Sequence, residues 1–582
     1  MKNMSNLSIK NLKLNLIWPY LVIIVIAFVY ALPQLNVRGI YVGADSSFHF
    51  NRAFEAMSRL KYLNFHNSQI SLYGFNASGR IINALYGPGL GYFFGVVLLL
   101  TKSWLKFQLV TNFILTVGTI SLSYWLFNKY SRQTVISLVF AIVLSLTSYW
   151  SISYWYLSSG GMSWGMMFLP LVIDAGIQMY INKNNPVKPL RLGIIMAVIL
   201  ESHMLSFVFS VGILAVFFTA AIVFSHNRVV LFKKSIFAAI ISIGLTLGYW
   251  ADFLIIIRSQ SILSPFVNLN PRNLSSNLYQ GLSFWLLIFS IVLIIALSGK
   301  LLSWQWLLFI MGLGFLIVAS GPEILLDHWN SISFLRTVQF PMRFTLPGVY
   351  LLSFFVVTML AQLFNQLSFK RSYTTAISVG VILLASVTIK NVFLNYTSSN
   401  QQFWENGNYL ESKFSIPNSN QKIDIQKKIQ SRNREFEKSI TVMNFEAPDY
   451  LPGSGSVYYG DKNYKIVNQN IISPVSRFNK HINKKGNLVV TWSQRNSHVI
   501  NVPVVIYRQS LITFNGRKII PKSTKNGVLK VMGYSGSNTV EISIKVPLVV
   551  HIAKLGPIIV ILTMLKIVVS KKRKKVDNDK EI

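Results

Sequence analysis

The chain has 582 residues, of which 52% are hydrophobic and 13% charged, and many apolar runs reach the roughly 20 residues that cross a bilayer. We therefore predict a polytopic membrane protein, which is not expected to bind nucleic acid. The absence of cysteine excludes disulfides, thiol catalysis, iron–sulfur clusters and Cys-ligated zinc. The formal net charge of +36 predicts anionic neighbours, either membrane lipid headgroups or an acidic polymer outside the cell.

The first predicted span covers residues 17–33. Lysines precede it and no small-residue cleavage site follows, so it is expected to be a retained anchor with a cytoplasmic N-terminus. Residues 34–83 then form a predicted outer loop, and a loop of about fifty residues is more often functional than a mere connection. A second span starts at residues 86–89.

Further spans are predicted at 107–127, 133–149, 162–180, 235–257, 279–298, 301–319, 346–366 and 374–391. The apolar run 192–224 is too long for one straight crossing, and Glu201 and His203 interrupt it. It is either one tilted helix, which places the basic loop 182–191 outside, or two short helices that meet at His203. The second alternative needs another short element near 131–160, and the total is twelve to fourteen spans.

Residues 392–546 are predicted to form an extracellular domain that is β-rich from about residue 440. Short alternating apolar runs are separated by turn signals such as Asn515-Gly516 and Asn526-Gly527, a pattern typical of a β-sandwich. This domain is also basic, which fits an anionic partner. Residues 547–570 are predicted as the final span, and 571–582 as a basic tail in the cytoplasm. Residues 1–391 then form the multi-spanning domain.

The stretch 41–59 carries the densest group of reactive side chains in the membrane-embedded half. Its apolar residues recur at helical spacing, which predicts a short amphipathic helix at the membrane surface with His49, Arg52 and Arg59 on its polar side. Asp45 stands at the start of this helix and is either an N-cap or a catalytic or ligand carboxylate. Glu55 is expected to be a solvated charge or the i+4 partner of Arg59.

Asp45 and His49 are four residues apart, so both side chains can face one site. This pair predicts either a general base beside an imidazole or a carboxylate–imidazole site for one divalent cation. No Walker loop, HExxH or GxSxG motif is present, so nucleotide-driven transport is unsupported.

Ionisable residues within apolar runs are functional candidates because charge in hydrocarbon is costly. Glu201 and His203 are either a satisfied buried pair or a second wall of an outward cavity. Arg336 and Arg343 stand at the outer edge of a span, against the positive-inside bias. They are either a clamp for a lipid phosphate or pyrophosphate, or they extend to the headgroups.

The chain resembles the large bacterial multi-spanning proteins of the YfhO type and the related 6-pyruvoyl-tetrahydropterin synthase-related membrane family, which are similar to GT-C glycosyltransferases. Four stretches carry the resemblance: Gly43-Ala44-Asp45 to His49, Ser202-His203-Met204-Leu205-Ser206, Gln339-Phe340-Pro341-Met342-Arg343-Phe344, and the outer β domain with Tyr450-Leu451-Pro452 and Tyr507 to Asn526. Ser159 and Trp164 depart from the family pattern of Arg and Glu. Either the donor is bound differently or this member is inactive.

The resemblance implies a transferase on the outer face of the bacterial plasma membrane that uses a polyprenyl-phosphate sugar as donor. Its acceptor would be a teichoic-acid-type polymer or a glycolipid. Asp45 occupies the place of the family's catalytic base or metal partner. His49 would assist, and Arg52, Glu201, His203, Arg336 and Arg343 would bind substrate or phosphate. The alternatives are a lipid or polymer transporter and a non-catalytic envelope assembly subunit.

Overall fold

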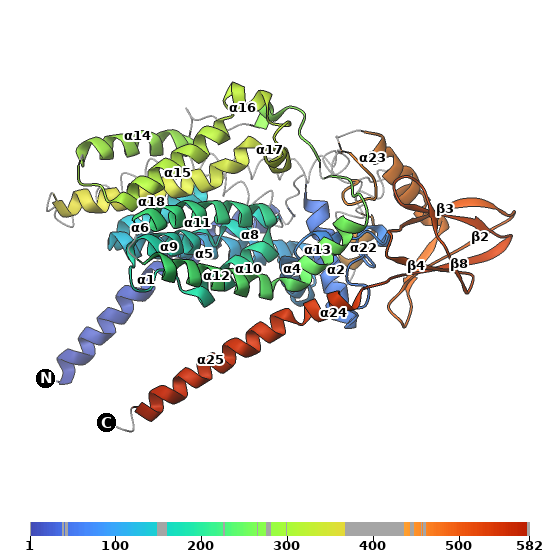
Figure 1. Cartoon of the computed structure of the whole chain (residues 1–582), viewed down its shortest axis with the longest axis horizontal. Coiled ribbons are helices and arrows are strands. Elements are labelled where there is room, and N and C mark those ends of the chain that lie inside the picture. The colour runs from blue at the N-terminus through green and yellow to red at the C-terminus, as the bar shows by residue number, and fades with distance from the viewer. Residues whose placement is uncertain are drawn as a thin grey trace.

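The computed structural model shows a body of packed helices with a β-rich domain at one end (Figure 1). The structure describes residues 2–37, 40, 45–147, 160–224, 227–264, 266–274, 281–297, 299–366, 436–442, 447–455, 457 and 461–578. The predicted fold class, a helical multi-pass membrane protein with a mainly-β domain before the last helix, is confirmed.

The helices of the first half follow the predicted spans closely, with short helices at the outer loop. They are α1 (Lys2–Val37), α2 (Ser46–Tyr62), α3 (Ile82–Leu85), α4 (Pro88–Thr101), α5 (Trp104–Ser131), α6 (Thr134–Thr147), α8 (Gly161–Met166), α9 (Leu169–Ile181), α10 (Pro189–Ser202) and α11 (Met204–Phe224). Pro88 begins α4 at a position where its missing N–H is not needed.

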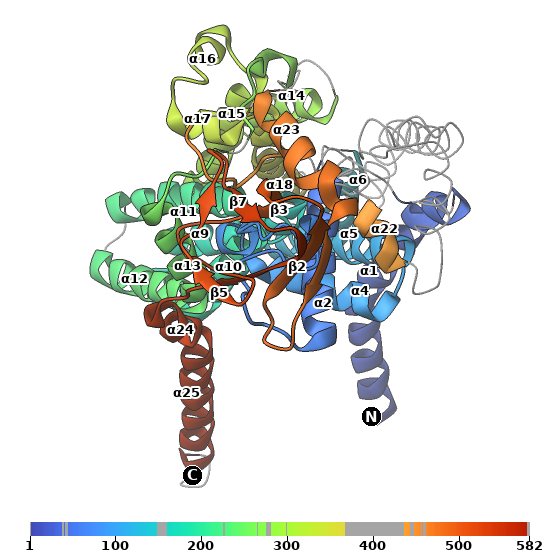
Figure 2. The same cartoon turned by 90° about the vertical axis from the view of Figure 1, so that its right-hand side faces the viewer.

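The second half continues with α12 (Arg228–Leu245), α13 (Leu247–Ser259), α14 (Gly281–Ala296), α15 (Ser303–Ser320), α16 (Glu323–Asp327), α17 (Ser333–Val338) and α18 (Thr345–Gln366). After the β-rich domain, α24 (Leu548–Lys554) and α25 (Gly556–Asn578) end the described chain. In Figures 1 and 2, α1 and α25 both extend away from the β-rich domain.

Six helical segments of the described chain are long and apolar enough to cross a membrane, and α12 with α13, bent by 73°, would be a seventh. Four shorter apolar helices accompany them: Ile17–Leu32, Pro88–Thr101, Thr134–Leu146 and Leu282–Ala296. The predicted span 374–391 lies outside the described residues. The total of twelve to fourteen spans therefore stays a prediction.

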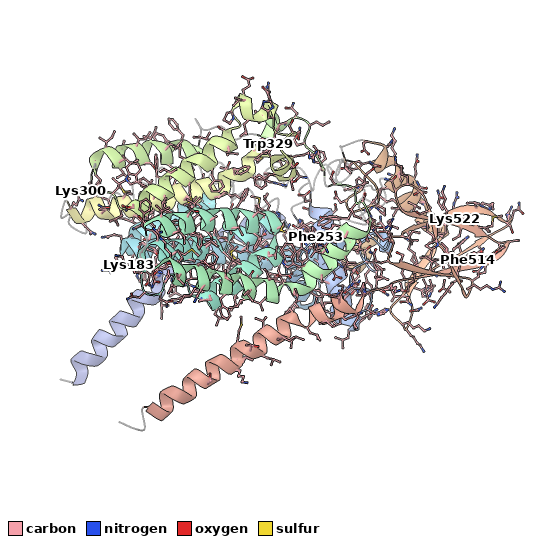
Figure 3. All side chains as sticks on the ribbon, in the orientation of Figure 1. Lys183, Phe253, Lys300, Trp329, Phe514 and Lys522 are labelled. Atoms are coloured by element: carbon pink, nitrogen blue, oxygen red, sulfur yellow. The ribbon has the colours of Figure 1, made fainter. Side chains whose placement is uncertain are left out.

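The long apolar run is two helices, because α10 ends at Ser202 and His203 adopts an extended backbone with φ −164° and ψ 120° before α11 begins. Figure 3 places Lys183 and Lys300 at one end of the helical body, opposite Phe514 and Lys522 of the β-rich domain. Lys183 of the basic loop 182–191 thus lies at the same end as Lys300. Helix α6 is the predicted span 133–149 itself, so the additional short element near 131–160 stays a prediction. Of the two alternatives, the structure has the one with helices that meet at His203.

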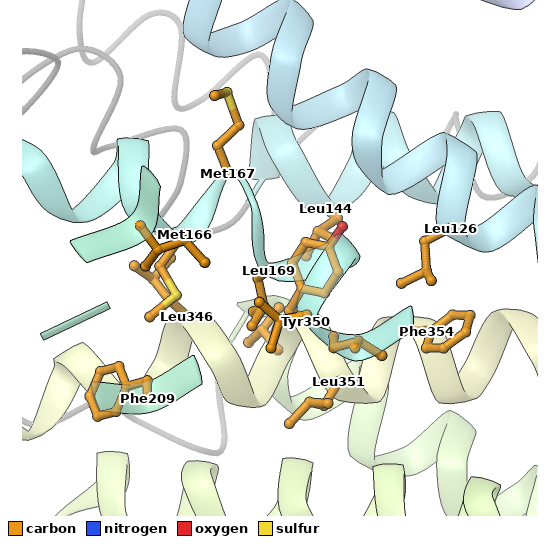
Figure 4. Close-up of a cluster of buried hydrophobic side chains, with 14 of the residues drawn as sticks. Leu126, Leu144, Met166, Met167, Leu169, Phe209, Leu346, Tyr350, Leu351 and Phe354 are labelled. Atoms are coloured by element: carbon orange, nitrogen blue, oxygen red, sulfur yellow. The ribbon is translucent and has the colours of Figure 1, made fainter. Parts of the chain in front are cut away.

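Helix α18 forms the centre of the helical body. In Figure 4 its residues Leu346, Tyr350 and Phe354 lie among side chains from α5, α6, α8, α9 and α11. Tyr350 is fully buried, and its hydroxyl lies 2.6 Å from the Ser123 hydroxyl, which satisfies both polar groups. A well-packed central helix of this kind holds the surrounding helices, and the loops at their ends, in fixed positions.

The β-rich domain has two antiparallel sheets, of order β1-β2-β8-β4-β5 and β3-β7-β6. The strands are β1 (Asn479–Ile482), β2 (Leu488–Gln494), β3 (His498–Val505), β4 (Ser510–Phe514), β5 (Arg517–Ile519), β6 (Lys522–Ser523), β7 (Val528–Gly533) and β8 (Gly536–Ile544). Asn515 and Gly516 both have positive φ and form the predicted tight turn between β4 and β5, with Phe514 opposite Arg517.

The core of the β-rich domain continues into the first outer loop. Buried residues of both sheets, such as Val490 and Leu529, belong to one apolar cluster with Leu72 and Ile81 of the loop. Four short helical segments of the described chain precede β1: α22 (Phe436–Val442), α23 (Lys462–Val467), the π-helix Asn468–Ile472 and the 3-10 helix Ser473–Arg477. The loop is therefore fixed between the helical body and the β-rich domain, and this positions the candidate site.

Candidate functional site

Helix α2 is not the predicted surface helix, because every residue from Ser46 to Arg59 is buried. The apolar side packs against α4, and the polar side faces the protein interior instead of water. The sequence pattern identified the two sides correctly. It could not show that the outer loop and the β-rich domain cover the polar one.

Glu55 and Arg59 form a structural unit. Their 2.8 Å ion pair is 1% exposed at both side chains, so the solvated alternative for Glu55 is wrong and the i+4 pairing is right. Glu55 also accepts the backbone N–H groups of Leu72, Tyr73 and Gly74 at 2.7–3.0 Å. The pair thus folds the outer loop over α2, and all of its carboxylate oxygens have partners.

Asp45 takes the N-cap position of α2, but its side chain makes no capping hydrogen bond, and the residue is exposed. The cap interpretation is therefore not supported by the geometry. The carboxylate instead lies close enough to Tyr86 and Asp449 to interact with them electrostatically. Asp45 thus stands at the solvent-facing edge of the polar cluster described next.

The centre of this cluster is Arg52, which is 3% exposed. One Nη donates to the Gly87 carbonyl at 2.5 Å, and the guanidinium carbon lies 4.1 Å from the centroid of the Tyr86 ring. Its Nε has no hydrogen-bond partner within the part of the chain that the structure describes. Glu201 and Tyr450 lie within electrostatic range. A buried guanidinium with a spare donor is a suitable group for a ligand anion.

Glu201 and His203 do not form the satisfied pair that was one alternative, since each has its own partner. Glu201 accepts the backbone N–H of Gly89 at 2.8 Å, and the His203 Nδ1 lies 3.1 Å from the Ser206 hydroxyl. Both residues lie near Arg52, and the ring centroid of His203 lies 6.4 Å from that of Tyr86. The break between α10 and α11 therefore forms one wall of the cluster.

The two arginines of the loop before α18, Arg336 and Arg343, do not lie at the same site. Arg343 donates to the Val338 carbonyl at 2.9 Å and to the Gln339 Oε1 at 2.8 Å, and it interacts electrostatically with Tyr86 and His203. Arg336 is exposed on α17, and its described contacts do not include the cluster. Of the predicted arginine clamp, the structure brings only Arg343 toward the other site residues.

Sequence reasoning missed the contribution of residues 447–450, which reach the cluster from the β-rich domain. The pKa of Asp449 is raised to about 6, chiefly by burial; the neighbouring Arg80 opposes this rise and Asp45 adds to it. Arg80 also donates to the Ala447 carbonyl at 2.5 Å. Asp449 has no helical or strand periodicity around it, so the only available signal was its position beside the family stretch that begins at Tyr450.

His49 has the character of a neutral imidazole. Burial lowers the pKa of His49 well below its usual value, and the nearby Arg52 and His203 lower it further. Its Nδ1 is buried and has no hydrogen-bond partner among the described residues. The ring of Phe48 packs edge-on at 5.2 Å between centroids. A neutral histidine with a free nitrogen can form a hydrogen bond with a ligand hydroxyl without taking up its proton.

We expect His49→Gln to flatten the acid side of the stability curve. In wild type, His49 of the unfolded state binds a proton below about pH 6.5, whereas His49 of the folded state does not. The free energy of unfolding therefore falls with decreasing pH by up to about 1.4 kcal/mol per pH unit. Thermal unfolding of the purified protein between pH 4.5 and 7.5 measures this slope. His498→Gln, at an exposed position, should keep the wild-type slope; equal slopes for all three proteins would contradict the expectation.

The wall at His203 depends on close approach of α8, and Gly161 permits it. A Cβ at Gly161 would overlap the Ser202 carbonyl and lie 2.8 Å from the Tyr86 hydroxyl. We expect Gly161→Ala to destabilise the protein by about 1–3 kcal/mol, the usual range for overpacking, and to displace Tyr86. Gly212→Ala is the control because nothing lies within 4 Å of its Cβ. Thermal unfolding compares the two, and equal stability would refute the tight contact.

The metal site predicted at Asp45 and His49 would have two protein ligands. Within the described ranges, no group of three or more aspartate, glutamate or histidine side chains comes together in a way that could hold a metal ion. Asp45 is exposed and His49 is buried. The two-residue site therefore stays a prediction.

The chain matches no family model and no curated protein, so membership of the YfhO-type family stays a prediction. Among solved structures it is similar to the oligosaccharyltransferase of Archaeoglobus fulgidus. The apo form has a TM-score of 0.40 at 12% identity, and the form tethered to an acceptor peptide 0.42 at 13%, each over 77% of this chain and 63% of that one. The complex of AglB with an inhibitory peptide and a dolichol-phosphate has a TM-score of 0.36 at 12% identity, over 71% of this chain and 60% of that chain. The chain thus spans about three fifths of the length of these structures.

Proposed function

We propose that this protein is a membrane glycosyltransferase that moves a sugar from a polyprenyl-phosphate donor to an acceptor of the bacterial cell envelope, on the outer face of the plasma membrane. The observation that carries the proposal is the cluster around Arg52. It combines a buried guanidinium with a spare donor, a solvent-facing carboxylate at Asp45 and a neutral imidazole at His49.

The proposed reaction uses the Asp45 carboxylate and the guanidinium groups of Arg52 and Arg343. Asp45 accepts the proton of the acceptor hydroxyl as its oxygen attacks the anomeric carbon of the sugar. The bond between that carbon and the phosphate oxygen breaks, and the electron pair leaves with the polyprenyl phosphate. Arg52 and Arg343 stabilise the charge that develops on this phosphate, and fixed positive groups in a dry site are effective at that step.

The remaining residues position these groups. Glu201 holds the start of α4 through the Gly89 N–H, and Tyr86 places its ring against Arg52. His49 is close to Arg52 and, as a neutral imidazole, can orient the acceptor hydroxyl through a hydrogen bond. Residues 447–450 close the cluster from the side of the β-rich domain, so an acceptor held by that domain would approach Asp45.

Glycan analysis of a deletion strain tests the proposal. Intact-mass and sugar analysis of wall polymers and glycolipids should show that one sugar modification is absent, and that wild type restores it while Asp45→Asn does not. Unchanged glycans in the deletion strain would refute the transferase. Full restoration by Asp45→Asn would remove the catalytic role of this carboxylate and favour a transporter or an assembly subunit.

A further inference from the structure

A large groove lies on the other side of α2 from the Arg52 cluster. It has a volume of about 980 Å³ and runs between α2 with the following loop, residues 51–77, and the turn between β1 and β2, residues 478–486. Asn51 and Phe54 of α2 line it, whereas His49 and Arg52 face the cluster. Figure 2 shows the β-rich end toward the viewer, with α2 and α22 beside β2.

One wall of the groove presents aromatic faces. The rings of Tyr62 and Tyr73 stack with an interplanar angle of 16° and centroids 6.0 Å apart, and Tyr62 is 59% exposed. Phe65 also lines the groove and is 48% exposed. Exposed aromatic rings offer a flat apolar surface with a polar tip at tyrosine, which suits the apolar face of a sugar ring.

The opposite wall is positively charged. Lys484 and Lys485 are exposed at the tip of the β1–β2 turn, and the described lining residues include no aspartate or glutamate. The nearby Glu541 accepts hydrogen bonds from Asn483 and Asn487 at 2.9 and 2.6 Å and lies within electrostatic range of Lys485, so Lys484 is the lysine of the turn without this acidic neighbour in the described structure. Side-chain amides of Asn64, Asn76 and Asn483 also line the groove. Asn64 and Asn483 already donate to Tyr73 and Glu541, whereas the Asn76 Nδ2 has no hydrogen-bond partner among the described residues and is a suitable donor to a hydroxyl group.

The two walls are joined by hydrogen bonds, so the groove is formed before any ligand binds. Asn67 of the loop donates to the Gly486 carbonyl at 2.9 Å and to the Asn487 Oδ1 at 3.0 Å. Lys480 is directed to backbone carbonyls on both sides, to Asn76 at 2.7 Å and Pro503 at 2.7 Å. A preformed groove loses little conformational freedom on binding.

We propose that this groove binds an anionic sugar polymer of the cell envelope, with sugar rings on the Tyr62 wall and phosphate or carboxylate groups on Lys484 and Lys485. A single-stranded nucleic acid also combines rings with negative charge, but the amides of the groove match hydroxyl-rich units better. The role of the groove as an acceptor site rests on the proposed function. Binding itself can be measured without any transfer.

The test uses the full-length protein in detergent and a fluorescent poly(glycerol phosphate) chain that carries sugar substituents. We expect Lys484→Gln/Lys485→Gln to weaken binding at least tenfold at low salt and to reduce its salt dependence. The matched control is Lys522→Gln/Lys530→Gln, which removes two exposed lysines that face each other on the other sheet. It should keep binding within twofold. Tyr62→Ala should weaken binding of the sugar-bearing polymer but not of inorganic polyphosphate.

Three results would overturn the proposal: no binding by wild type, equal loss from both lysine pairs, or equal affinity for size-matched dextran or a thymidine oligonucleotide. The two proposals also fail separately. If polymer binding needs the groove but the deletion strain has unchanged glycans, the proposed transferase activity is refuted and the proposed binding site is kept. If the glycans change but the groove variants bind like wild type, the proposed binding site is refuted and the proposed transferase activity is kept.

Discussion

Asp45→Asn should reduce the rate of sugar transfer by about 10²–10⁴-fold, the range that a positioned general base supplies, while leaving the folded protein intact. Stability should not change by more than about 0.5 kcal/mol, because the Asp45 side chain makes no capping hydrogen bond and asparagine is an equally good N-cap. Transfer from a synthetic polyprenyl-phosphate sugar, measured beside thermal unfolding of the same preparation, checks both halves of the expectation.

The control for this experiment is Asp327→Asn. Asp327 is 57% exposed and pairs with Arg272 at 2.8 Å on the surface, so its loss should not affect transfer. Asp449→Asn is the informative second variant, because it changes a buried carboxyl beside Asp45 that sequence reasoning missed. Full transfer by Asp45→Asn would exclude Asp45 as the base, and unfolding of this variant would contradict the expected unchanged stability.

Glu55→Gln should give the largest loss of stability, about 3–5 kcal/mol, which is the usual result of removing one partner from a buried ion pair. The substitution leaves the buried guanidinium of Arg59 without its carboxylate. It also places an amide NH₂ against N–H groups of residues 72–74, which then lose an acceptor. The yield of monodisperse protein and its thermal unfolding in detergent measure the effect.

Lys61→Gln is the matched comparison, since Lys61 lies on the same helix and pairs with Glu437 at 2.7 Å. Their side chains are 35% and 31% exposed, and such pairs contribute about 0–1 kcal/mol. If both variants unfold at the same temperature, the buried pair is not what fixes the outer loop.

The extent of the sequence prediction can be seen on particular elements. The β2, β4, β7 and β8 strands fall on the alternating runs, because alternation reports burial of one sheet face directly. The break at His203 was also visible, as polar residues interrupt an apolar run. Both signals come from residues that are close together in the sequence, so they could be read without knowing the fold.

The site itself was only partly visible. Asp45, His49 and Arg52 drew attention as a group, but the burial of His49 and Arg52 depends on segments far away in the sequence, such as residues 447–450. The polar side of α2 looked like a solvent face because periodicity does not distinguish water from a polar interior. No periodicity or motif in the sequence marks Asp449 or Tyr86 as a site residue. Arg336 and Arg343 looked equivalent in the sequence, and only the fold shows that Arg343 alone lies toward the cluster. Of the two departures from the family pattern, Ser159 lies outside the described residues, and Trp164 is buried in α8.

The contacts that fix the first outer loop have a consequence for the order of biosynthesis. Asn67 accepts the N–H of Ile544, which is made 477 residues later, and Tyr507 reaches Ile81 over 426 residues. Until the last strands leave the ribosome, α2 and its polar side lack their cover. Contacts so distant along the chain form slowly. In a nascent chain, or in one truncated before β8, the cluster of Asp45, His49 and Arg52 is therefore not yet assembled. It is completed only after the strands of the β-rich domain have been made.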